Sequence, residues 1–235
     1  MTGGRVAKDL LVSEIFGPTY QGEGPSIGQR AVFLRLSRCQ LNCSFCDTSY
    51  TWDTRRYDVA AETRRMSQSQ VVEELMARPA ALVVITGGEP LLQQDRLTWV
   101  IDVCRARRRR VEIETNGAVL PSQGVRGAAH RFNVSPKLAN SGIPAERRIN
   151  PEALRTFVRS GKAVFKFVVQ TPGDLEEIAK LEAEHDLAPI WVMPLGTTAD
   201  QVLDGARAVA DDALARGWNL TTRLHVLLWG DVRGR

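Results

Sequence analysis

The stretch Cys39-Gln40-Leu41-Asn42-Cys43-Ser44-Phe45-Cys46-Asp47-Thr48 carries three thiols within eight residues. Clustered cysteines in a sequence without signs of secretion indicate a metal site rather than disulfides. A structural zinc site uses four protein ligands, whereas three thiolates can hold an iron–sulfur cluster and leave one iron open. The stretch therefore favours an iron–sulfur cluster held by Cys39, Cys43 and Cys46.

A zinc knuckle is the alternative for the same stretch. The remaining cysteine, Cys104, lies in Leu97-x-x-Val100-Ile101-x-x-Cys104, which has the spacing of the apolar face of a helix. We therefore expect Cys104 to pack in the core. A zinc site would need a distant histidine as its fourth ligand, from among His130, His185 and His225.

The composition is that of a globular protein with a sizeable core. The 235 residues are 43% hydrophobic and 25% charged, which predicts one domain over residues 1–235. No apolar run reaches the roughly 18 residues that a membrane helix needs. The first nine residues contain no apolar signal core. We expect a cytoplasmic protein that has no membrane partner.

The positive charge is concentrated in one segment. The formal net charge is +4, and the run Arg105-Ala106-Arg107-Arg108-Arg109-Arg110 holds five of the positive side chains at a predicted helix end. Cations are favourable at the C-terminal end of a helix, and they are easily solvated there. The run has no interleaved aromatic residues that would stack on bases. Nucleic acid is therefore not an expected partner.

Strand-like and helix-like segments alternate along the chain. Strands are predicted over residues 10–16, 31–36, 81–85, 111–117, 132–137, 163–170, 189–195 and 224–229, and helices begin near residues 67, 93, 150, 171 and 198. This alternation predicts an α/β protein with a largely parallel sheet and helical crossovers. The expected architecture is an open partial (β/α) barrel of about six mostly parallel strands.

Polar motifs follow several of the predicted strands. Thr86-Gly87-Gly88-Glu89-Pro90, Glu114-Thr115-Asn116-Gly117 and Ser135-Pro136-Lys137 each stand at a strand end, and the cysteines follow another strand. The carboxyl ends of parallel strands share one edge, so these motifs predict a single active site there. Arg35 interrupts an apolar strand, and it must either reach solvent or meet an anion in a pocket.

The cysteine spacing together with Gly87-Gly88-Glu89 resembles the radical S-adenosylmethionine (SAM) superfamily. The resemblance implies a 4Fe–4S cluster on the three cysteines, with the amino and carboxylate groups of SAM on the fourth iron. It also implies that the Gly-Gly-Glu strand end binds the amino group of SAM. Glycine suits that place because the methionine part of SAM packs against bare backbone.

A closer resemblance is to the 7-carboxy-7-deazaguanine synthase family. It rests on motifs in the family's order over nearly the whole chain, which are Glu14–Gly24, Val32–Arg35, Cys46–Trp52, Thr86–Pro90, Glu114–Gly117, Ser135–Lys137 and Leu224–Gly230. It implies a carbon–nitrogen lyase that converts 6-carboxy-5,6,7,8-tetrahydropterin to 7-carboxy-7-deazaguanine with loss of ammonia. The implied mechanism takes a hydrogen from the carbon bearing the carboxylate and returns it to the product. Mg2+, an electron donor such as flavodoxin or ferredoxin, and a homodimer are also implied.

The resemblance assigns roles to individual residues. Those implied to line SAM are Phe45, Gly88, Glu114, Ser135, Pro136, Lys137, Met193, Pro194, Leu195 and Gly196. Those implied to surround the pterin are Tyr20, Gln21, Gly22, Glu23, Arg35, Thr86 and His225. Thr48 is implied to bind Mg2+. Some relatives place a terminal proline carboxylate against the substrate, whereas this sequence continues past Gly230 to Arg235.

Two other functions stay open on the sequence. A glycyl-radical activating enzyme shares the cysteine spacing and Thr86–Pro90, but it leaves Gln21-Gly22-Glu23 and His225 unexplained. A basic zinc-bound tRNA-binding module accounts for the arginine run and the cysteines. It leaves the polar residues at the strand ends without a role.

Overall fold

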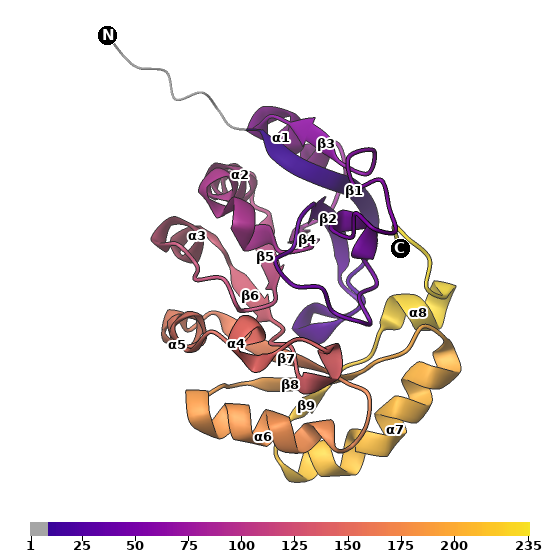
Figure 1. Ribbon diagram of the computed structural model, residues 1–235. Helices are drawn as coiled ribbons and strands as arrows, with labels where there is room; N and C mark the ends of the chain where they lie inside the picture. Colours follow the sequence, from indigo (N-terminus) through magenta and orange to yellow (C-terminus); the bar gives the residue numbers. More distant parts are fainter. Residues whose placement is uncertain (1–8) are drawn as a thin grey trace.

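One curved sheet forms the centre of the fold in the computed structural model of the chain (Figure 1). The structure describes residues 9–235. The residues before Asp9, which were expected to lack a signal core, lie outside the described part. The strand order is β3-β1-β2-β4-β5-β6-β7-β8-β9. The bounds are β1 Leu10–Tyr20, β2 Arg30–Leu36, β3 Arg64–Met66, β4 Leu82–Gly87, β5 Arg110–Thr115, β6 Arg131–Val134, β7 Ala163–Val169, β8 Ile190–Pro194 and β9 Asn219–Leu220.

Seven of these strands, β2 and β4–β9, run parallel, and β1 and β3 join antiparallel at one edge. The predicted α/β class with an open, mostly parallel barrel is confirmed. The sheet has more strands than the expected six or so. Two of the additional strands, β3 and β9, have only three and two residues, which is too short for a period-two pattern.

Most of the helices cover the outer face of the sheet (Figure 1). The helices of the described residues are α1 Gln68–Met76, α2 Gln94–Ala106, α3 Gln123–Ala128, α4 Ala145–Arg148, α5 Pro151–Ser160, α6 Asp174–His185, α7 Ala199–Ala215 and α8 Leu224–Trp229. The predicted capping box of α1 is present between Ser67 and Gln70. The side chain of Asn150 accepts the first free N–H groups of α5, as predicted. No helix in the described part of the chain is both long enough and apolar enough to cross a membrane.

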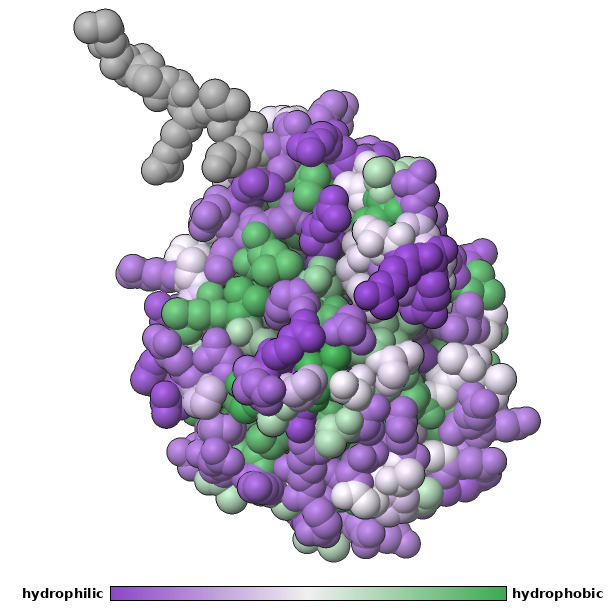
Figure 2. Space-filling view, in the orientation of Figure 1, coloured by the Kyte–Doolittle hydropathy of each residue, from purple (hydrophilic) through white to green (hydrophobic). Residues whose placement is uncertain are grey.

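Alternate residues of each strand separate the core from the inside of the barrel. On β5, Val111 and Ile113 pack in the main core against the helices, whereas Glu114 lines the inner cavity. On β7, Phe165 and Phe167 are core residues. Cys104 of α2 is fully buried in the same core, which confirms its predicted packing role. On the face shown in Figure 2, hydrophilic side chains cover most of the surface and hydrophobic ones show between them near the centre.

Two segments differ from the prediction. The first strand was expected to end at Phe16, but β1 continues to Tyr20 after a register shift between Phe16 and Thr19. Residues 224–229 were expected to form a strand, and they form the helix α8 instead. A short apolar run fits either element, and the sheet already ends at β9. The N–H of Leu224 donates to the carbonyl of Gly22 (2.8 Å), which brings α8 to the end of β1.

Part of the arginine run has a structural role. The guanidinium of Arg109 donates to the carbonyls of Leu75 and Met76 (2.7 and 3.2 Å) at the end of α1. The carbonyl of Leu75 also accepts from the N–H of Arg78 (3.2 Å), and Arg109 adds a side-chain cap to the last carbonyls of the helix. Arg110 lies on β5 and contacts the amide of Gln29.

Candidate active site

One pocket opens at the carboxyl ends of the parallel strands, and almost all the residues assigned above line it. They are Cys39, Cys43, Phe45, Cys46, Thr48, Gly88, Glu114, Ser135, Lys137, Met193 and Leu195, together with Tyr20, Gln21, Gly22, Glu23, Arg35, Thr86 and His225. The exceptions are Pro136, Pro194 and Gly196, which do not line it. Pro136 and Pro194 are buried, and the ring of Pro194 lies where a side chain on Gly205 would need to go.

The three clustered cysteines are free thiols on the same pocket wall. Among residues 9–235, no three His, Cys, Asp or Glu side chains converge as ligands of a single metal ion, so the geometry gives no support to a zinc knuckle. Cysteines that hold a 4Fe–4S cluster bind different irons, and they need not meet at one point. The donor set therefore fits such a cluster. Burial raises the pKa of the Cys39 thiol to about 12, so a bound cation is needed to make it a thiolate.

Three N–H groups already point at these sulfurs, one of them the amide Nδ2–H of Asn116, which lies 3.8 Å from Cys39 Sγ. The indole Nε1–H of Trp52 donates to Cys46 Sγ (3.3 Å), and the backbone N–H of Leu41 donates to Cys39 Sγ (3.4 Å). Hydrogen bonds to cluster sulfurs tune the reduction potential of iron–sulfur centres. Trp52 was not among the predicted site residues.

The glycines at the end of β4 let two strand ends pack together. A Cβ on Gly88 would lie 2.2 Å from the carbonyl oxygen of Arg38, and one on Gly87 would lie 2.1 Å from that of Leu36. The expected reason for glycine here was a close approach of SAM. The structure supplies a second reason, which is contact with the chain that enters the cysteine loop.

Glu89 of the Gly-Gly-Glu motif does not line the pocket. It is fully buried, and its carboxylate accepts from Thr115 Oγ1 (2.8 Å) and from the N–H of Asn116 (2.8 Å). Burial raises the pKa of this carboxyl despite these hydrogen bonds. Glu89 therefore connects the end of β4 to the end of β5, and Gly87 and Gly88 are the part of the motif that lines the pocket.

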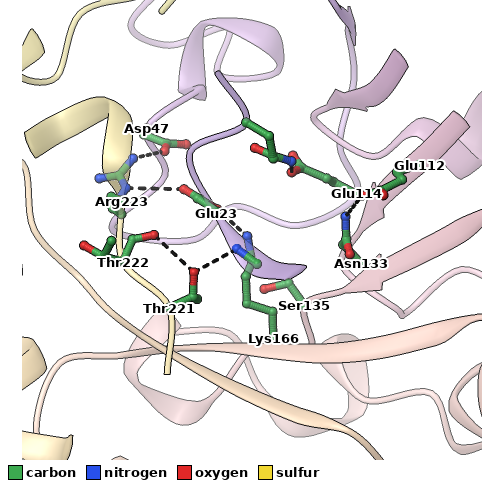
Figure 3. A network of polar contacts seen from close by, with 12 residues as sticks. Glu23, Asp47, Glu112, Glu114, Asn133, Ser135, Lys166, Thr221, Thr222 and Arg223 are labelled. Carbon is green, nitrogen blue, oxygen red and sulfur yellow. Dashed lines mark hydrogen bonds and ion pairs between the residues drawn. The ribbon is translucent and has the colours of Figure 1, made fainter. Parts of the chain in front are cut away.

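Charged side chains that line the same pocket are joined in one network of polar contacts (Figure 3). Glu23 forms an ion pair with Lys166, and its Oε1 lies 3.4 Å from Nε of Arg223. Burial would raise the pKa of Glu23, but the charges of Lys166 and Arg223 outweigh burial and hold the pKa far below its ordinary value. Glu23 is therefore an ionised hydrogen-bond acceptor at neutral pH.

The neighbours of Glu23 are also fixed. The amide of Gln21 donates from Nε2 to Glu114 (3.0 Å), which links a residue assigned to the pterin with one assigned to SAM. His225 packs on Gly22, where an added Cβ would lie 2.0 Å from Nδ1. Burial lowers the pKa of His225, so its imidazole is neutral at neutral pH.

Arg35 lines the pocket and has a partner of its own, Glu14 on the adjacent strand. The contact joins Nε to Glu14 Oε1 (2.6 Å), and the hydroxyl of Tyr50 donates to the same oxygen (2.8 Å). The terminal nitrogens of Arg35 donate no hydrogen bond to any residue in the described range. An anionic group that enters the pocket could therefore bind to them. The guanidinium also lies over the ring of Phe16, which stacks on Phe33.

Thr48 lies beside the last cysteine, with its Oγ1 3.7 Å from Cys46 Sγ. It precedes the helical turn Ser49–Thr51, but its side chain makes no capping hydrogen bond there. Its neighbour Asp47 forms an ion pair with Arg223 (2.6 Å). The Thr48 hydroxyl is therefore not committed to the turn.

Lys166, Arg223 and Trp52 line the pocket and were missed by sequence reasoning. Asp47, which also lines it, was considered only as an alternative Mg2+ ligand, and Asn116 only as part of the motif Glu114–Gly117. Lys166 interrupts the apolar strand Ala163–Val169 just as Arg35 interrupts β2, so the same argument would have found it. Arg223 and Asp47 lie in segments without a strand pattern, and their pairing spans 176 positions of the chain.

The fold and the three-cysteine pocket define a radical SAM protein. A family model described as "Radical SAM superfamily" matches residues 34–129, which include the cysteine loop and Thr86–Pro90. The 7-carboxy-7-deazaguanine synthase of Pyrobaculum aerophilum is 35% identical over 96% of this chain and 97% of its own length. The 7-carboxy-7-deazaguanine synthase of Hyperthermus butylicus is 33% identical over 93% of this chain and 92% of its own length. The chain belongs to the 7-carboxy-7-deazaguanine synthase family. The crystal structure of QueE from Escherichia coli matches with a TM-score of 0.70 and 26% identity, covering 92% of this chain and 95% of that one.

Proposed function

We propose that this chain is a radical SAM lyase that converts 6-carboxy-5,6,7,8-tetrahydropterin to 7-carboxy-7-deazaguanine with loss of ammonia, a ring contraction that serves queuosine and 7-deazapurine biosynthesis. The observation that carries the proposal is a single cavity lined by two kinds of side chains. They are three free thiols, here called the cysteine wall, and the polar residues Gln21, Glu23, Arg35 and His225, here called the charged wall. A cluster cofactor and a polar heterocycle would thus meet in one pocket.

The cysteine wall would hold the cofactors. Cys39, Cys43 and Cys46 would bind the 4Fe–4S cluster, and the SAM beside it would contact Phe45, Gly88, Ser135, Lys137, Met193 and Leu195. When bound, this pair supplies the carbon-centred radical that abstracts a hydrogen atom from the substrate. Lys137 is oriented by a hydrogen bond to Ser135 Oγ (3.1 Å). Its ammonium suits the carboxylate of SAM.

The charged wall would orient the pterin. An ionised Glu23 accepts hydrogen bonds from the N–H groups of the pterin's guanidine-like edge, and Lys166 keeps it ionised. Arg35 offers its terminal nitrogens to the substrate carboxylate as a bidentate pair. Gln21, held by Glu114, and neutral His225 supply further polar contacts. This arrangement presents the carbon that bears the carboxylate to the cysteine wall.

The stacked rings of Phe16 and Phe33 line the pocket next to Arg35, and their centroids are 4.8 Å apart. An apolar surface beside the guanidinium limits hydration and so strengthens its contact with a carboxylate. We assign Mg2+ to the Thr48 hydroxyl together with oxygen atoms of the substrate, because Mg2+ prefers hard oxygen ligands and keeps several waters.

The wider setting is also part of the proposal. We propose a homodimer that works in the cytoplasm and receives its electron from a small redox protein such as flavodoxin or ferredoxin. The continuous nine-stranded sheet of residues 9–235 supports the assignment of the chain to one domain. The family to which the chain belongs supports the substrate.

Anaerobic reconstitution with iron and sulfide, followed by turnover of the carboxytetrahydropterin with SAM and a strong reductant, tests the proposal. The expected result is the absorption of the deazaguanine product, and a Cys43→Ala variant should give none. Cleavage of SAM without loss of the pterin would instead favour a glycyl-radical activating enzyme. A zinc-loaded protein without iron or sulfide would favour the tRNA-binding module.

A further inference from the structure

Arg223 contacts three segments of the chain around the pocket. It directly precedes α8 and is 3% exposed. Its Nη1 donates to the carbonyl of Gly196 (2.6 Å), its Nη2 donates to Asp47 (2.6 Å), and its Nε lies 3.4 Å from Glu23 (Figure 3). Gly196 ends the turn after β8 on the SAM side, Asp47 belongs to the cysteine loop, and Glu23 belongs to the charged wall.

The negative charge of Glu23 is balanced even without Arg223. Lys166, which is also buried, already forms an ion pair with this carboxylate. Asp47 is about half exposed, so water solvates its charge. Arg223 differs from Lys166 in shape. Its planar guanidinium can direct N–H groups at three acceptors from three segments at once. A buried guanidinium that spans all three acceptors restrains their relative positions.

We propose that Arg223 is a positioning residue that couples binding of the pterin to binding of SAM. This inference rests on the proposed function. A ligand that holds Glu23 in place also holds the guanidinium, which in turn orders the turn at Gly196 and the loop at Asp47 for the second ligand. Coupling of this kind is reciprocal, so each ligand must raise the affinity for the other by the same factor.

The test measures equilibrium binding in the reconstituted enzyme under anaerobic conditions without reductant, so that no turnover occurs. The Kd for SAM is measured with and without saturating carboxytetrahydropterin, and the Kd for the pterin with and without SAM. For each ligand, the ratio compared is the Kd without the other ligand divided by the Kd with it. In the parent protein the two ratios should be equal, at about five or more. In Arg223→Gln both ratios should fall towards one. Arg223→Lys keeps the charge but loses the fork, so its ratios should also fall.

Arg148 offers a matched control. It is a buried arginine whose guanidinium donates to the carbonyls of Ile143 and Lys137 (2.9 and 2.7 Å), on the SAM side, without contact to Glu23. In Arg148→Gln the affinity for SAM can change, but the two ratios should remain those of the parent.

Two results would overturn the coupling role, namely parent ratios of one, or parent-like ratios in Arg223→Gln. If that variant does not fold, Asp47→Asn is used instead, because it weakens only the contact between Arg223 and the half-exposed Asp47. It should lower both ratios, and unchanged ratios in this variant also count against the role. A parent protein that does not bind the pterin at all overturns the proposed function itself. These outcomes separate the two claims.

Discussion

The Nε of Arg35 and the carboxylate of Glu14 lie 2.6 Å apart across the paired strands β1 and β2. This contact explains how a charged residue is tolerated inside a mostly apolar strand. Burial would lower the pKa of Arg35, but Tyr50 and Glu14 raise it above its ordinary value, so the guanidinium stays charged. Glu14 therefore positions Arg35 through Nε and leaves its terminal nitrogens free for the substrate contact proposed above.

Replacing Arg35 with lysine tests this clamp. An ammonium cannot form the bidentate contact, and a charge-assisted hydrogen bond contributes roughly 1.5–3 kcal/mol. We expect Arg35→Lys to bind the carboxytetrahydropterin about tenfold or more weakly, measured by equilibrium binding, while SAM cleavage under strong reductant is retained. Glu14→Gln keeps a hydrogen-bond acceptor and should have a smaller effect. Parent-like substrate affinity in Arg35→Lys would refute the clamp.

The cluster ligands are tested by iron content. Cys39→Ala, Cys43→Ala and Cys46→Ala should each lose the cluster, measured as iron and sulfide per chain. Cys104→Ala is the matched control, since this thiol is buried in the core far along the chain. It should keep its iron and lose on the order of 1 kcal/mol of unfolding free energy. Loss of iron from Cys104→Ala, with iron retained in one of the other three, would show that the ligand assignment is wrong.

Thr48 is tested by a pair of substitutions. Serine keeps the hydroxyl and alanine removes it, so we expect Thr48→Ser to retain stimulation of turnover by Mg2+ and Thr48→Ala to lose most of it. Both variants should keep the cluster and bind SAM. If Thr48→Ala responds to Mg2+ as the parent does, the metal lies elsewhere, and Asp47 is the next candidate.

Trp52 should tune the cluster. Its N–H stabilises negative charge on Cys46 Sγ, and this stabilisation is greater in the reduced state. Trp52→Phe removes the donor but keeps an aromatic ring, so the reduction potential should become more negative in an anaerobic spectroelectrochemical titration. Trp99→Phe is the control, because Trp99 is an exposed tryptophan on α2. Equal potentials in the two variants would contradict the tuning role.

Much of the fold and half of the pocket could be predicted from local patterns. Apolar strands that end in polar motifs place those motifs at one sheet edge, so the cysteines, Gly88, Glu114 and Ser135 were expected together. The helix α8 was missed because six residues with several apolar side chains carry no decisive period. Its orientation is set by contacts with distant segments, such as Leu224 with Gly22.

The charged network was harder to foresee for a similar reason. The partners of Arg223 and of Lys166 lie far away in the sequence, and Lys166 meets Glu23 across 143 positions. Local propensity does not encode which of several carboxylates a buried cation will meet. Only the curvature of the sheet, which brings β1, β7 and the segment before α8 around one cavity, determines that choice.

The conversion of the carboxytetrahydropterin to 7-carboxy-7-deazaguanine with loss of ammonia is tested by the stoichiometry of one anaerobic reaction with the pterin, SAM and a strong reductant. Mass spectrometry would quantify 7-carboxy-7-deazaguanine and SAM, and an enzymatic assay would quantify ammonia. We expect one ammonia for each product molecule and more product formed than SAM consumed, since the abstracted hydrogen returns to the product. Consumption of SAM with neither ammonia nor deazaguanine would contradict it.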